Sequence, residues 1–254
     1  MLEQLSATKL DCYLQCPLKF KLRYIDLIEP EEVSAPLAFG SATHGTIKHV
    51  YRKLMAGQRL TIEEAEASFK QDWEAQCCVP IRFNGSTAEE LEQQGIALVR
   101  AYLEAVPEPV VPVAVEKELC APITNLITGE TITGIELHGI LDRIEPGNRP
   151  IELKTSSQSY SQLRVDISLQ FSIYSYLIAY NAQADKIEGD YEIIVKTKTP
   201  KMQRLTTRRT ARDFDRLFRT VQHVLRNIES GAFYPNRSHM FCPSCDYVPH
   251  CMKW

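Results

Sequence analysis

The chain has 254 residues, of which 44% are hydrophobic and 24% charged, with a net charge of -3. This composition is ordinary for a globular protein and excludes a disordered or fibrous chain. We see neither a signal peptide at the N-terminus nor 18 consecutive apolar residues, so we expect a cytoplasmic protein with no membrane span.

The expected elements change from helices to strands at Pro107. Apolar spacing and capping residues predict helices at about 6–14, 46–54, 61–76 and 88–106. Strands are expected at 113–121, 131–145, 150–154, 192–198 and 203–206, and further helices at 167–180 and 213–228. This order predicts an α/β domain with a mixed sheet over 1–254, in which 55–110 forms a helical insertion.

Two neighbouring strands carry the residues with the clearest chemistry: Asp142 in GILD, and Glu152 and Lys154 in ELK. Residues two apart on a strand project from the same face, and the turn at Pro146 can bring Asp142 beside Glu152. Paired carboxylates suit Mg²⁺ or Mn²⁺, and the nearby ammonium can position water or stabilise phosphate charge. Charged pairs are also common on exposed sheet faces, but here the apolar neighbours predict strands that are largely buried: Ile140, Leu141, Ile151 and Leu153.

Basic residues gather between Lys196 and Arg226, where ten of them stand against two acidic residues. A local charge of +8 on an otherwise acidic chain indicates a surface for DNA phosphates, although a solvated helix face would look the same. The residues expected to bind DNA are Arg143, Lys196, Lys198, Arg204, Arg208 and Arg209.

Three cysteines lie close together near the C-terminus, at Cys242, Cys245 and Cys251, and Cys16 lies far upstream. Clustered thiols in a reducing compartment indicate a metal site, and spacing alone allows zinc, with His250 as a further ligand, or an iron–sulfur cluster. The remaining thiols, of Cys12, Cys77, Cys78 and Cys120, are expected to be buried, although Cys12 lies close enough to compete with Cys16.

Taken in order, GSATH, GILD, ELK, QFSIY and the cysteines resemble the RecB-like nucleases of the PD-(D/E)XK superfamily. The resemblance implies a restriction-endonuclease-like core. It implies catalytic roles for Asp142, Glu152, Lys154, Gln170 and Tyr174, and metal ligation by His44, Asp142, Glu152 and the carbonyl of Leu153. Leu141 stands where the superfamily's name has proline.

The cysteine pattern is similar to that of CRISPR-associated RecB-like exonucleases and AddB-type nuclease domains. It implies a [4Fe-4S] cluster held by Cys16, Cys242, Cys245 and Cys251, which would join Cys16 to the 232–254 segment. The implied activity is a metal-dependent exonuclease that prefers single-stranded DNA, in CRISPR adaptation with integration proteins or in recombination and repair with a helicase. The alternative is a DNA-binding or scaffolding subunit that does not cut.

Overall fold

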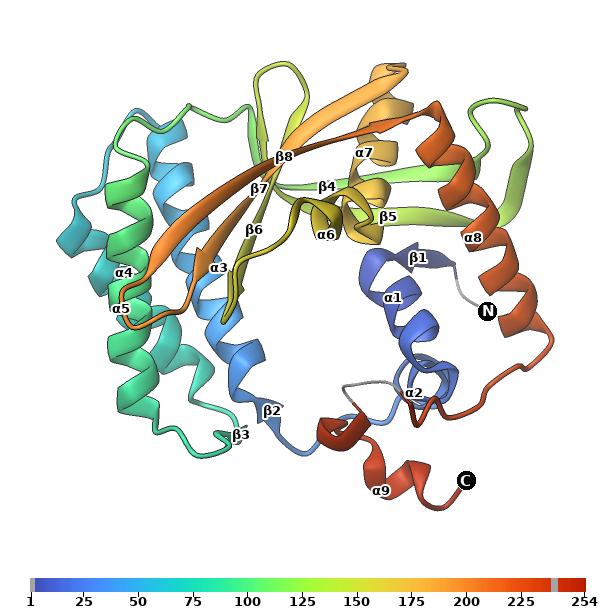
Figure 1. The fold of residues 1–254 in the computed structure, drawn as a ribbon, viewed down its shortest axis with the longest axis horizontal. Coiled ribbons are helices and arrows are strands. Elements are labelled where there is room, and N and C mark those ends of the chain that lie inside the picture. Colours follow the sequence, from blue (N-terminus) through green and yellow to red (C-terminus); the bar gives the residue numbers. More distant parts are fainter. Residues whose placement is uncertain (1–2, 239–241) are drawn as a thin grey trace.

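The computed structural model describes residues 3–238 and 242–254, and its centre is one mixed sheet (Figure 1). The strands are β1 (Gln4–Ser6), β2 (Val33–Ser34), β3 (Ile81–Arg82), β4 (Ala114–Thr124), β5 (Thr131–Glu145), β6 (Arg149–Ser156), β7 (Lys186–Val195) and β8 (Lys201–Thr210). The helices are α1 (Ala7–Gln15), α2 (Pro17–Phe20), α3 (Ala35–Met55), α4 (Ile62–Gln76), α5 (Ala88–Ala105), α6 (Gln162–Asp166), α7 (Leu169–Ala182), α8 (Ala211–Glu229) and α9 (Val248–Cys251). A π-helical turn at Lys21–Ile25 and a 3-10 turn at Cys242–Ser244 complete them.

The sheet follows the order β1-β5-β6-β7-β8, and β4 pairs along the other edge of β5. β4, β5 and β6 are antiparallel, whereas β6 and β7 are parallel. A parallel pair needs a crossover, which α6 and α7 provide. The predicted mixed sheet is therefore confirmed.

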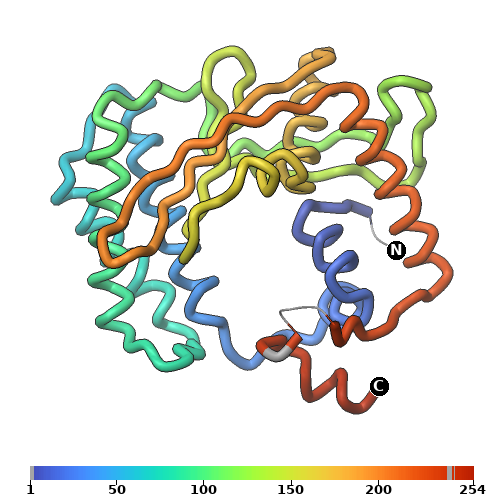
Figure 2. Tube along the Cα trace, in the orientation of Figure 1, coloured from blue at the N-terminus to red at the C-terminus, as the bar shows by residue number. Residues whose placement is uncertain are grey.

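Helices cover the sheet on two sides (Figure 2). On one side, α3, α4 and α5 share an apolar core with Leu153 and Ile194 from the sheet. On the other side, α1, α7 and α8 pack against β4 and β5. In β7, Ile193 and Ile194 enter different cores because successive strand residues face opposite sides.

Several predicted elements hold and others are longer than expected. Thr61 and Thr87 cap α4 and α5 through complete capping boxes, and Ser6 caps α1. The helix expected at 46–54 begins instead at Ala35, because Gly40 and Gly45 have low helix propensity and obscure its start in the sequence. In the described ranges, no helix is long and apolar enough to cross a bilayer.

Candidate active site

The centre of the candidate site lies where β5 and β6 separate. The last residues that pair there are Arg143 on β5 and Ile151 on β6. Beyond this pair, the carboxylate of Asp142 on β5 accepts a hydrogen bond of 2.9 Å from the backbone N–H of Leu153 on β6. The Asp142 side chain therefore supplies a hydrogen-bond acceptor for the backbone amide that follows Glu152, and this bond fixes the position of the Asp142 carboxylate.

Glu152 and Lys154 share one face of β6, as their spacing predicts, and α7 lies beside them. The ammonium of Lys154 donates to Glu152 Oε1 at 2.5 Å and to Gln170 Oε1 at 2.9 Å. Gln170 Nε2 then donates to the hydroxyl of Tyr174 at 3.0 Å. The four residues thus form one polar chain between β6 and α7.

Close packing of α7 against β5 depends on Gly139. A β-carbon at this position would come within 2.9 Å of the Tyr174 ring and of Leu177. Such an approach is too short for a normal contact, so a larger residue would push α7 and its polar chain away from the strand. The glycine of GILD therefore positions Tyr174.

Glu152 is an unusual carboxylate, since it is only 2% exposed and its Oε2 atom has no hydrogen-bond partner within residues 3–238 and 242–254. Burial raises the pKa of Glu152 to about 7, although the neighbouring Lys154 lowers it in part. Burial lowers the pKa of Lys154, but the charge of Glu152 more than reverses this, so the pKa lies above its ordinary value. An unpaired buried oxygen beside a second carboxylate fits a divalent cation.

His44 completes the group from α3. Its Nδ1 atom lies 3.4 Å from Asp142 Oδ1. Burial lowers the pKa of His44, but its hydrogen bond and charge interaction with Asp142 raise it above the usual value overall. Burial raises the pKa of Asp142, and His44, Lys154 and the Leu153 amide outweigh this and lower it. Of the side chains predicted to ligate a metal, His44 and Asp142 are therefore in contact, and Glu152 is close enough for its charge to act on His44.

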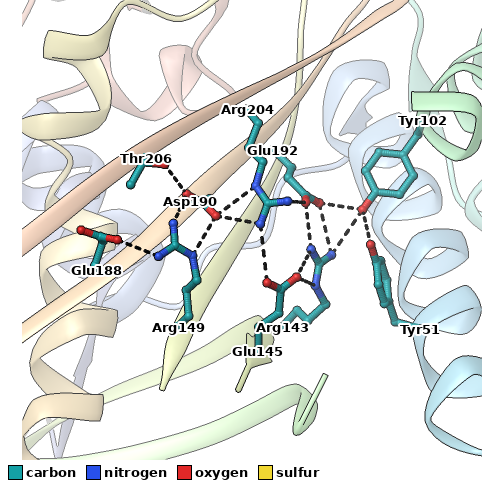
Figure 3. A network of polar contacts seen from close by, with 10 residues as sticks. All are labelled: Tyr51, Tyr102, Arg143, Glu145, Arg149, Glu188, Asp190, Glu192, Arg204 and Thr206. Carbon is teal, nitrogen blue, oxygen red and sulfur yellow. Dashed lines mark hydrogen bonds and ion pairs between the residues drawn. The ribbon is translucent and has the colours of Figure 1, made fainter. Parts of the chain in front are cut away.

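Two of the arginines expected to bind DNA are instead part of the interior. Arg143 is 4% exposed, and its Nη2 atom lies 2.9 Å from Glu192 and 3.0 Å from Glu145 (Figure 3). Its guanidinium also lies 3.9 Å from the centre of the Tyr51 ring. Arg143 compensates buried acids, so its predicted role in DNA binding is wrong for this structure.

Arg209 is 1% exposed and donates only to neighbouring groups of the protein in the described part of the chain. The acceptors include the hydroxyl of Ser172 at 2.7 Å and the backbone carbonyls of Val165 and Ser168 at 2.9 and 3.1 Å. Because these bonds join β8 to the start of α7, Arg209 is a structural residue. Its predicted contact with DNA is likewise wrong.

The other predicted DNA-binding residues keep some access to solvent. Lys198 and Arg208 are exposed. Lys196 is partly buried over the Phe39 ring, and burial lowers its pKa. Arg204 is 40% exposed but pairs with Asp190 at 2.7 Å. The accessible basic surface is therefore smaller than the count of charges in the sequence indicates.

The four cysteines predicted to hold a cluster line a single cavity of about 50 Å³. Leu18, Leu22 and Tyr247 form an apolar contact group around them. The backbone N–H of Asn236 lies 3.4 Å from Cys16 Sγ, and the Asn236 side chain donates to the carbonyl of Gln15 at 2.9 Å. The two ends of the chain thus meet at the predicted ligands.

The remaining cysteines differ from expectation in their exposure. Cys12 is buried as predicted, and burial raises the pKa of its thiol to about 11. Cys77, Cys78 and Cys120 are exposed, so their predicted burial is wrong. Cys77 and Cys78 follow the end of α4 at Gln76, so they do not lie on the apolar face of that helix.

Sequence patterns also missed a second group of possible metal ligands. Glu118 and Cys120 on β4 and His138 on β5 have ligand atoms within 4.8 Å of one another. Cys120 is opposite His138 in the strand pairing, and His138 Nε2 lies 2.8 Å from Glu118 Oε1. The two-residue spacing of Glu118 and Cys120 is visible in the sequence, but the cross-strand register is needed to bring His138 beside them.

Comparison with known proteins places this geometry in a family. The sequence matches the profile of the PD-(D/E)XK nuclease superfamily over residues 4–252. Among solved structures, a protein of Eubacterium rectale named as a candidate exonuclease is similar with a TM-score of 0.60 and 13% identity, over 98% of this chain and 88% of that one. At this identity the likeness shows the fold alone.

Two other solved structures are less similar. SSO0001 has a TM-score of 0.34 and 15% identity, over 90% of this chain and 93% of its own. Rai1 of Scheffersomyces stipitis has a TM-score of 0.25 and 11% identity, over 89% and 70%. No curated protein sequence matches the chain. Since the family profile spans nearly all of the sequence and the fold agrees, the chain belongs to the PD-(D/E)XK nuclease superfamily.

Proposed function

We propose that this protein is a metal-dependent DNA exonuclease that prefers single-stranded DNA. Family membership supports nuclease activity. The observation that carries the proposal is Glu152, whose buried Oε2 atom has no hydrogen-bond partner in the part of the chain that the structure describes, and whose charge interacts with Asp142 and Lys154. A buried, unpaired carboxylate oxygen is costly unless a ligand compensates it.

The residues that would hold Mg²⁺ or Mn²⁺ are His44, Asp142 and Glu152, with the carbonyl of Leu153. When bound, such an ion lowers the pKa of water and stabilises negative charge that develops on phosphate. Their donor set of carboxylate oxygens and one imidazole fits these ions.

Lys154 stays protonated because Glu152 holds its pKa above the ordinary value. It can therefore orient a water molecule or a phosphate oxygen through its N–H groups, but it does not act as a base in this state. Gln170 accepts from the ammonium and Tyr174 accepts from Gln170, so both restrict the direction of Lys154. Their proposed part in the reaction is to position this lysine.

We further propose that Cys16, Cys242, Cys245 and Cys251 hold a [4Fe-4S] cluster with a structural role. The fit rests on four thiols around one cavity with apolar neighbours and an N–H group directed at Cys16. A link between Cys16 and Cys251 would close a very long loop and so restrict the unfolded chain.

The biological role that we propose is the trimming of DNA ends, either in CRISPR adaptation with integration proteins or in recombination and repair with a helicase. Both roles follow from the similarity in motifs. The alternative function, a DNA-binding or scaffolding subunit without activity, is less favoured because all four residues are present, with His44 in contact with Asp142 and Lys154 in contact with Glu152.

The exonuclease proposal is tested by comparing three substrates with Mn²⁺: linear single-stranded DNA, the same sequence closed into a circle, and a blunt duplex. We expect rapid release of nucleotides from the linear strand, slower digestion of the duplex and an intact circle. Cleavage of the circle would identify an endonuclease. Binding of all three substrates without cleavage would favour the scaffolding function.

A further inference from the structure

The space around the candidate site is unequal on its two sides. A cavity of about 420 Å³ lies beside Lys154 and Gln170. The space on the other side, next to His44 and Asp142, measures only about 20 Å³. Pockets that bind small ligands span about 300–1,000 Å³, so of these two spaces the one beside Lys154 has room for a nucleotide.

Tyr160 and Arg164 line this cavity together with Lys154 and Gln170. The guanidinium of Arg164 lies 3.6 Å from the centre of the Tyr160 ring. Stacking uses the flat face of the guanidinium and leaves the N–H groups at its edge free to bind an anion. Arg164 is exposed, so a ligand can reach it.

Tyr160 is held firmly although it lies in a loop. Its backbone N–H donates to the side chain of Gln203 at 2.9 Å, and Gln203 donates back to the carbonyl of Tyr160 at 2.9 Å. The Tyr160 and Tyr191 rings lie 6.4 Å apart between their centres. The loop therefore presents a fixed aromatic support beneath Arg164 rather than a mobile side chain.

We infer that this cavity binds one unpaired nucleotide of the DNA strand, with Arg164 holding the phosphate next to the one that is cut. The inference deepens the proposed nuclease function and rests on it. Arginine binds phosphate through paired N–H groups, which the stacking of Arg164 on Tyr160 leaves at the edge of the guanidinium. Asp11 on α1 also lines the cavity, and its negative charge favours placing the phosphate beside Arg164.

The preference for single strands follows from the size of this space. A cavity of about 420 Å³ is within the range of pockets that hold one small ligand, so we expect one nucleotide to enter it without its paired base and a duplex end to open first. Opening a base pair costs free energy, and a single strand needs no such step.

The experiment uses the full protein with its cluster and Mn²⁺, and DNA whose second linkage from the digested end is a neutral methylphosphonate. For the wild type, we expect this change to raise KM about 10- to 100-fold, with kcat changed less than about threefold. Arg164→Ala should raise KM for normal DNA by a similar factor and be insensitive to the methylphosphonate. Arg164→Lys should recover part of the loss, because it keeps the charge.

Arg100→Ala is the matched control, since Arg100 is an exposed arginine on α5 that pairs only with Glu66 among the described acids. It should behave as the wild type. Equal methylphosphonate sensitivity in Arg164→Ala and wild type would overturn the inference while leaving the nuclease function intact. If the wild type cuts no DNA, the proposed function fails, and the same comparison on DNA affinity in Ca²⁺ still decides whether Arg164 contacts this phosphate.

Discussion

The buried carboxylate of Glu192 lies 2.9 Å from the guanidinium of Arg143, the residue that follows Asp142 on β5 (Figure 3). Tyr102 donates a hydrogen bond of 2.6 Å to the other oxygen of Glu192. Arg204 lies 3.8 Å from Glu192 and 2.7 Å from Asp190. Salt bridges thus connect β5, β7 and β8 directly behind the candidate site.

Arg143→Ala should destabilise the protein by about 3–5 kcal/mol, because Glu145 and Glu192 would keep their burial and lose their main partner. Urea unfolding measures this change. Arg100→Ala removes an ion pair whose arginine is exposed, with Glu66, and should cost much less stability. Equal losses in the two variants would show that the buried network does not stabilise β5.

Glu152 should make the stability of the metal-free protein depend on pH. Burial raises its pKa from 4.5 to about 7, so folding favours the protonated form. This contribution is fully present below about 4.5 and is lost as pH rises through about 7. Relative to the wild type, Glu152→Gln should therefore gain roughly 2–6 °C in Tm between pH 5 and pH 8 without divalent ions.

Glu74→Gln is the control for this measurement, since Glu74 is exposed on α4. Its Tm difference from the wild type should be the same at both pH values. Mn²⁺ should bind more tightly as pH rises toward about 7, because the ligand form of Glu152 is the carboxylate. A Tm difference for Glu152→Gln that does not change with pH would contradict the raised pKa.

Cys16→Ser should remove the visible absorbance of the anaerobically purified protein and lower its iron content. The reason is that Cys16 is one of the four proposed ligands, and its replacement leaves only three of these thiols to hold the cluster. Cys77→Ser, which changes an exposed thiol after α4, should keep both. A colourless wild type with one equivalent of zinc would contradict the iron–sulfur assignment and favour a zinc site.

Arg208 and Arg209 are neighbours with different expected effects. Arg208 is exposed, so Arg208→Ala should weaken DNA binding and reduce the slope of log affinity against log salt by about 1. Arg209→Ala should leave the slope unchanged and cost at least about 2 kcal/mol of stability, since Arg209 is buried and hydrogen-bonded. Fluorescence anisotropy at several KCl concentrations and urea unfolding separate the two effects. A reduced slope in Arg209→Ala would contradict its structural role.

The sequence was enough to predict the strand pair that carries the site. Two-residue spacing placed Glu152 and Lys154 on one face, and a short turn placed Asp142 on the neighbouring strand. Burial of individual side chains was less predictable. Ile140 is 49% exposed although its apolar character predicted burial, because β4 and β5 leave that face open to solvent there.

Charges in the sequence were the least reliable guide. Arg143 and Arg209 look like surface residues because their partners, Glu192 and Ser172, lie 49 and 37 positions away along the chain. The wall formed by Tyr160 and Arg164 also has no periodic pattern, since it belongs to a loop and to the short helix α6. Only the packed sheet and helices bring these groups together.

The central claim is that Asp142, Glu152 and Lys154 act together on a phosphodiester bond with a divalent ion. The most direct measurement is the cleavage rate of end-labelled linear single-stranded DNA with Mn²⁺ for the wild type, Asp142→Asn and Lys154→Ala, each with unfolding checked by circular dichroism. Asp142→Asn keeps an oxygen that can accept from Leu153, so its fold should be preserved. We predict that both folded variants lose at least about a hundredfold in rate; equal cleavage by all three proteins would contradict the claim.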